Sequence, residues 1–97
     1  MSTLHLLSHS PFGDTRLHSC LRLMAPGDGL LLSGDAVYAL RPGTEPFEAL
    51  QARPQDCALF VLGEDLEARG LPPVDGALDY PGFVELCGQY DKVNSWL

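Results

Sequence analysis

The 97-residue chain is poor in basic residues and has no long hydrophobic run. Six Lys and Arg stand against 13 Asp and Glu, which gives a formal charge of −7. No run reaches the roughly 18 apolar residues that a membrane span requires, and we expect no signal peptide at Met1–His5. Because an acidic surface repels phosphate backbones, we also expect no direct binding of nucleic acid.

The chain also lacks the cysteine patterns of disulfide-bonded and zinc-binding domains. Its three cysteines are Cys20, Cys57 and Cys87, and none belongs to a CxxC motif. An odd number at wide spacing favours free thiols in a reducing compartment, so we expect a cytoplasmic protein.

Motifs for nucleotide and metal cofactors are likewise missing. The sequence contains neither G-x-G-x-x-G nor G-x-x-x-x-G-K-[ST], so its glycines are interpreted as turn residues. His5, His9 and His18 fall on a predicted strand, a loop and a helix, and so do not share a face that could ligate a metal. We therefore expect no cofactor and no metal, and interpret His5 as a core or interface residue.

The residues that are present predict one α/β domain covering residues 1–97. Apolar residues make up 45% of the chain, and short apolar runs alternate with amphipathic stretches. We predict strands at 3–7, 30–32 and 57–62, a possible edge strand at 77–78, helices at 15–24, 45–52, 64–69 and from 80 onward, and a short helix or strand at 36–40. Strands that alternate with helices predict a small three-layer, Rossmann-like fold with a mainly parallel sheet of four to five strands.

Two of the predicted helices carry an apolar stripe. The first is expected to bury Leu17, Cys20, Leu21, Leu23 and Met24. The last is expected to begin at a cap formed by Asp79 and to bury Phe83, Val84, Leu86, Cys87 and Tyr90.

A hydrolytic site is conceivable where the first two strands end. Ser10, His9, Ser33 and Asp35 follow these strands, and the carboxyl ends of parallel strands meet at one edge of a sheet. No G-x-S-x-G nucleophile elbow supports a catalytic triad. The same loops would serve a stand-alone protein that binds a small ligand.

The cysteines are the other candidates for chemistry. Cys57 and Cys87 are interpreted as core residues. Cys20 lies within an apolar stripe, and Arg16, one turn earlier, would stabilise its thiolate if the edge of the stripe were open. The helix start after the third strand would favour a thiolate, but it carries Glu64 and Asp65 instead of cysteine.

Several segments, taken in order, resemble the TusB/DsrH family, the small subunits of the TusBCD and DsrEFH sulfur-relay complexes. They are Leu4-His5, Ser10-Pro11-Phe12, Gly27 to Leu32, Asp35 to Ala39, Leu62 to Gly70, Asp79-Tyr80, Phe83-Val84 and Trp96-Leu97. The resemblance covers nearly the whole chain.

The resemblance implies a DsrEFH-like fold and a subunit that forms a heterohexamer with TusC/DsrF-like and TusD/DsrE-like partners. In the TusBCD branch, a TusA-like donor passes persulfide sulfur to the TusD-type subunit, which hands it to a TusE-like acceptor for 2-thiolation of the tRNA wobble uridine. The TusD-type cysteine follows the third strand, where this chain has Glu64 and Asp65. The resemblance therefore implies a structural or docking role, not a catalytic one.

The resemblance leaves a second interpretation open for Cys20. DsrH-type members have a cysteine in the first helix, in a context like Ser19-Cys20-Leu21. Cys20 is thus a candidate sulfur acceptor in a DsrH-type subunit for dissimilatory sulfur oxidation. At the end of the chain, we expect Trp96 and Leu97 to pack against the chain's own core or a sister subunit.

Overall fold

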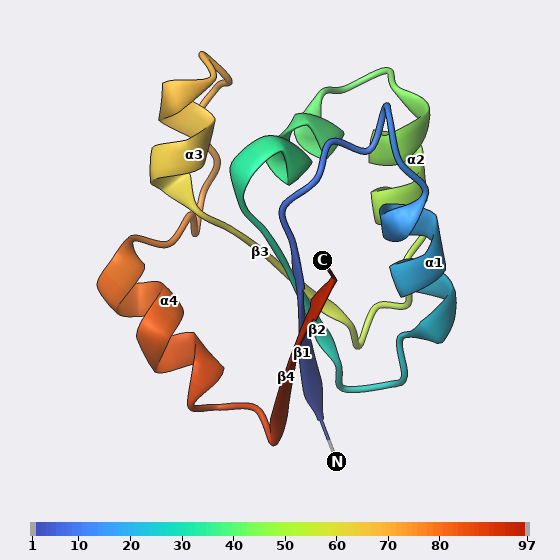
Figure 1. Ribbon diagram of the computed structural model, residues 1–97, viewed down its shortest axis with the longest axis vertical. Coiled ribbons are helices and arrows are strands. Elements are labelled where there is room, and N and C mark those ends of the chain that lie inside the picture. Colours follow the sequence, from blue (N-terminus) through green and yellow to red (C-terminus); the bar gives the residue numbers. More distant parts are fainter. Residues whose placement is uncertain (1, 97) are drawn as a thin grey trace.

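The computed structural model of the protein describes residues 2–96 as a sheet flanked by helices (Figure 1). The strands are β1 (Thr3–Leu7), β2 (Gly29–Leu32), β3 (Ala58–Val61) and β4 (Lys92–Trp96). The α-helices are α1 (Arg16–Leu23), α2 (Glu45–Gln51), α3 (Gly63–Ala68) and α4 (Tyr80–Cys87), and a 3₁₀ helix, η1, covers Gly34–Leu40. No helix within residues 2–96 is long and apolar enough to cross a membrane.

The four strands form one parallel sheet in the order β3-β2-β1-β4. This confirms the predicted α/β class and parallel sheet. The predicted edge strand at 77–78 is reduced to a single bridge between Leu78 and Leu62. The C-terminal segment, which the sequence did not predict as a strand, is β4 and pairs with β1 from Thr3 to Leu7.

Alternating side chains of the sheet divide the core into two layers. Leu7, Leu30 and Leu32 face a cluster that includes residues of α1, α2 and η1. Leu4 and Leu31 face the opposite cluster, to which α4 contributes Leu86. Figure 1 shows α1 and α2 on one side of the sheet and α4 on the other, which gives the expected three layers.

Side-chain caps mark where α4 and α2 begin, and a local hydrogen bond precedes α1. The Asp79 side chain accepts a hydrogen bond from the Gly82 N–H (2.8 Å), as predicted, and Pro81 lies in the first turn of α4. Thr44 caps α2 by accepting from the Phe47 N–H (3.4 Å). The Asp14 carboxylate accepts from the Arg16 N–H (2.7 Å) at the start of α1.

Two residues that were predicted to face inward are instead exposed. Leu23 on α1 and Val84 on α4 are each 69% exposed. At about 100° of rotation per residue, each lies roughly 110° from the centre of its helix's apolar stripe, beyond the edge of the packed face. The two predictions were therefore wrong, because both residues were assigned to stripes that are narrower than assumed.

Candidate functional site

A chain of three hydrogen-bonded side chains crosses the buried part of the sheet. Asp28 and His5 are each only 5% exposed. The His5 Nε2 atom lies 3.2 Å from the Asp28 Oδ2 atom, and the Trp96 indole N–H donates to His5 Nδ1 at 3.1 Å. These three hydrogen-bonded side chains therefore connect the turn before β2 with the first strand and the C-terminal strand.

The indole N–H of Trp96 defines which ring nitrogen of His5 carries the proton in the neutral tautomer. An indole N–H can only donate, so Nδ1 of His5 must accept and carry no proton. The proton of the neutral imidazole then lies on Nε2, where it is donated to the Asp28 carboxylate. The Trp96 N–H thus occupies the Nδ1 lone pair, and each ring nitrogen of His5 has one hydrogen-bond partner.

Asp28 is stabilised as a buried carboxylate by three donors. Burial alone would raise its pKa, but hydrogen bonds from the Ala25 N–H (3.0 Å), the Thr3 N–H (2.9 Å) and His5 outweigh burial and lower the pKa. The site joins three segments that are distant in sequence, and its polar groups are paired with one another. Its geometry therefore supports a role in fixing the sheet, and it confirms the interpretation of His5 as a core residue.

Cys20, the candidate sulfur acceptor, lies on α1 with its side chain fully buried in the larger core. Burial, and secondarily the negative charge of Asp28, raise the pKa of its thiol to about 12. Arg16 does not face it as a cationic partner, because its guanidinium is paired with Asp14. In this conformation the thiol is protonated and shielded from solvent, which is the opposite of what a nucleophilic cysteine needs.

Of the other two cysteines, Cys57 occupies a core position, as predicted, whereas Cys87 is only partly buried. Cys57 is 1% exposed, and its thiol donates a hydrogen bond to the Ala25 carbonyl oxygen with an S···O distance of 3.4 Å. Burial, followed by the charges of Asp56 and Asp28, raises the pKa of its thiol. Cys87 is half-buried and packs against the α4-side cluster.

The residues considered for a hydrolytic triad are engaged elsewhere. The Ser33 hydroxyl donates to the Leu7 carbonyl oxygen (3.1 Å), and the Ser10 hydroxyl oxygen accepts from the Phe12 N–H (3.3 Å). Asp35 is paired with Arg69 at 2.9 Å. Within residues 2–96 no hydrogen bond joins His9 to any of these side chains, so the predicted constellation is not assembled.

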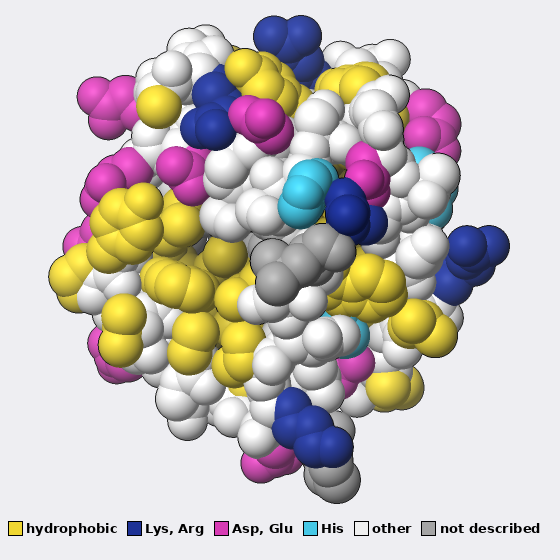
Figure 2. Space-filling view, in the orientation of Figure 1, with side chains coloured by type: hydrophobic (Ala, Val, Ile, Leu, Met, Phe, Trp, Pro, Cys, Tyr) yellow, Lys and Arg dark blue, Asp and Glu magenta, His cyan; other side chains and the backbone are white. Residues whose placement is uncertain are grey.

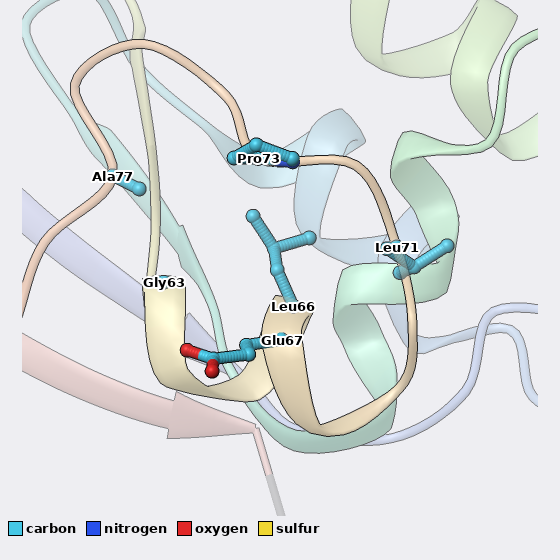
Figure 3. A pocket seen from close by; sticks show the side chains of 6 residues that line it. All are labelled: Gly63, Leu66, Glu67, Leu71, Pro73 and Ala77. Carbon is cyan, nitrogen blue, oxygen red and sulfur yellow. The ribbon is translucent and has the colours of Figure 1, made fainter.

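The start of α3, where a catalytic cysteine would be favoured, is built from carboxylates. The Asp65 Oδ2 atom accepts a hydrogen bond from the Gly34 N–H (2.8 Å) and so ties α3 to η1. A hollow of about 310 Å³ adjoins this helix, and Figure 3 shows Leu66 pointing across it toward Pro73. Its lining is Gly63, Leu66, Glu67, Leu71, Pro73 and Ala77. None of these residues carries a thiol or a hydroxyl group, and Glu67 is the one charged side chain among them.

No group of three or more His, Cys, Asp or Glu side chains in the described part of the chain is placed to hold a metal ion.

Comparisons with known proteins identify the family. Residues 9–93 match the family described as "DsrH like protein". The chain belongs to the DsrH-like family. Proteins named "Protein TusB" align over 97 positions, covering 96% of this chain and 99% of theirs. Their identities are 41% in Erwinia tasmaniensis, 39% in Serratia proteamaculans (strain 568) and 37% in Klebsiella pneumoniae (strain 342).

The DsrH-like assignment confirms the family resemblance that was inferred from the sequence. Sequence reasoning nevertheless missed the buried site of this DsrH-like chain. Asp28 was considered only within the segment Gly27 to Leu32 that carries the family resemblance, and Trp96 was expected to pack without an assigned polar partner. A carboxylate directly before a fully apolar strand was the available signal, but its contact with His5 depends on strand pairing.

Proposed function

We propose that this DsrH-like chain is a non-catalytic subunit of a cytoplasmic sulfur-relay complex that supports 2-thiolation of the tRNA wobble uridine. The observation that carries this proposal is the nearly end-to-end similarity to proteins named TusB. A match over this length supports the same kind of subunit, not merely a shared fold.

The non-catalytic role is supported by the state of the cysteines. Cys20 and Cys57 are buried, and the pKa of each thiol is raised. The family resemblance implies TusD-type partners with a cysteine after the third strand, and in this chain the position after β3 is occupied by Glu64 and Asp65. Asp65 contributes to folding through its hydrogen bond to Gly34.

The same resemblance supplies the proposed partners. The chain would assemble with TusC/DsrF-like and TusD/DsrE-like subunits as a heterohexamer with two copies of each. A TusA-like donor and a TusE-like acceptor would then exchange sulfur with the TusD-type subunit and contact this chain only indirectly. A domain of this size buries only about 60–65% of the surface that its unfolded chain exposes, so contact with partners would add to its stability.

An alternative proposal keeps Cys20 as the sulfur acceptor of a DsrH-type subunit in dissimilatory sulfur oxidation. Its thiol would first have to become exposed, which requires α1 to separate from the larger core. A second alternative, a stand-alone ligand-binding protein, would use the loops of His9, Ser33 and Asp35. The latter two side chains already pair with Leu7 and Arg69.

The test is the 2-thiouridine content of tRNA in the source organism. Deletion of the gene should abolish wobble 2-thiouridine, and both the wild-type chain and Cys20→Ala should restore it. A deletion strain with normal 2-thiouridine would contradict the proposal. If Cys20→Ala failed to restore the modification although the protein accumulated and folded normally, Cys20 would carry sulfur and the non-catalytic role would be wrong.

A further inference from the structure

The two faces of the sheet are covered to different extents. In the described residues, the cluster beneath α1, α2 and η1 has eleven buried members, whereas the α4-side cluster has four: Leu4, Leu31, Leu62 and Leu86. Around these four, Leu6, Phe60, Leu78, Phe83, Cys87 and Tyr90 are only partly buried. The single helix α4 therefore leaves much of this face accessible.

Large apolar side chains continue from this face to the surface. Tyr80 and Val84, one turn apart on α4, are 51% and 69% exposed. Val93 on β4 is 44% exposed and pairs with Leu4, so it points to the same side of the sheet as α4. Figure 2 shows hydrophobic side chains gathered over α4 and continuing toward the sheet.

The outer edge of β4 adjoins this face, and within residues 2–96 its outward backbone groups have no hydrogen-bond partner. β4 is the last strand in the order β3-β2-β1-β4. The Lys92 N–H donates to the Ser2 carbonyl oxygen at 3.1 Å, toward β1. Because backbone groups alternate in direction along a parallel strand, those of Val93 and Ser95 point away from the sheet. Proline and charged residues usually protect a free edge from pairing with another chain. The strand β4 contains no proline and only one charged residue.

Charge distinguishes between possible occupants of this surface. Asp79, Glu85 and Asp91 are exposed on or beside α4, and α4 itself carries no basic residue. Residues 51–97 hold three Lys and Arg against eight Asp and Glu, a net charge of −5. A second copy of the chain would bring like charges together around the contact, so the rim favours a basic partner.

We propose that Tyr80, Val84, Val93 and the outer edge of β4, here called the α4–β4 surface, dock a different protein whose apolar contact residues are framed by Lys and Arg. The inference rests on the proposed function, because it assigns a surface to the contact between subunits. A central apolar cluster with a charged rim is the usual anatomy of a specific interface.

Two residues provide a matched test of the apolar centre. Val84 and Leu23 are equally exposed, each in an eight-residue helix, but on opposite sides of the sheet. The full chain with Val84→Glu or Leu23→Glu is co-expressed with the TusC-like and TusD-like proteins of its source, captured and examined by native mass spectrometry. Val84→Glu should weaken the complex by roughly tenfold or more, and Leu23→Glu should leave it intact.

A second pair tests the charged rim. Glu85 on α4 and Glu48 on α2 are both exposed, but only Glu85 borders the α4–β4 surface. Glu85→Lys should slow association and reduce its dependence on salt, whereas Glu48→Lys should not. Thermal unfolding of each isolated variant checks that the substitution leaves the fold unchanged.

The outcomes separate the surface from the function. If the wild-type chain captures neither sister protein, both the proposed function and the docking surface are wrong. Suppose instead that the complex forms and Val84→Glu leaves it intact, whether or not Leu23→Glu disrupts it. The proposed function then stands, and the assignment of the α4–β4 surface is wrong. A homodimer of the isolated chain that Val84→Glu dissociates would also overturn the inference, since the occupant would then be a second copy.

Discussion

Replacing Asp28 by Asn should strongly destabilise the fold while leaving its shape almost unchanged. The carboxylate accepts from the Thr3 N–H on one oxygen, and from the Ala25 N–H and His5 on the other. An amide offers one oxygen and one NH₂, so either orientation turns a donor toward another donor. His5 cannot relieve the conflict by changing tautomer, because Trp96 donates to its other nitrogen.

The size of the effect follows from the burial of the site. A hydrogen bond to a charged group contributes about 1.5–3 kcal/mol, and a buried donor left unpaired costs about 1–3 kcal/mol. We therefore expect Asp28→Asn to lower the free energy of unfolding by about 2.5–6 kcal/mol. At about 4–8 °C per kcal/mol for a domain of this size, the Tm should fall by roughly 10 °C or more.

Urea and thermal unfolding of the isolated chain provide the assay, with Asp56→Asn as the control. Asp56 is exposed in the turn before β3, so its substitution should change stability by only about 0.5 kcal/mol. If Asp28→Asn were no more destabilising than Asp56→Asn, the account of the buried site would be refuted.

The pH dependence has a defined sign. The pKa of Asp28 is lower in the folded state than its usual value of 3.8, so its contribution to stability is complete above that value and is lost as the pH falls through the folded pKa. The stability difference between wild type and Asp28→Asn should therefore narrow as the pH falls below about 4. A difference that stayed constant from neutral to acidic pH would contradict this assignment.

Three further predictions concern single residues. Trp96→Phe removes the indole N–H but keeps an aromatic ring, so it should cost about 1 kcal/mol in urea unfolding; no loss would mean that the contact with His5 contributes nothing. Cys20 should resist iodoacetamide at pH 8 in the folded chain and react in denaturant, as followed by mass spectrometry; rapid labelling of the native protein would refute its burial. Ser95→Pro should preserve the fold, because the lost N–H points outward, but weaken assembly with the sister subunits; unchanged assembly would exclude pairing of a partner with this edge.

The apolar runs made most of the sheet predictable. The apolar run Leu30-Leu31-Leu32 indicated a strand, and the strand β2 is there and buried throughout. The C-terminal strand was not predictable in this way, because Lys92, Asn94 and Ser95 give it the composition of a polar tail. It is a strand because it pairs with β1, and such pairing is not encoded in local residue periodicity.

The buried site was only partly predictable for a related reason. His5 could be assigned to the core from its position in an apolar strand. Its partners depend on the register that pairs Leu4 with Gly29 and places Trp96 beside Leu7. Asp28 looks like an ordinary turn residue until that register brings β1 against it.

Native mass spectrometry of the tagged chain, purified from its own cells, tests the central claim most directly. We expect a complex in which the chain occurs twice, together with two homologous subunits that also occur twice each. Recovery of the chain alone as a monomer, with neither sister subunit bound, would contradict the assignment as a sulfur-relay subunit.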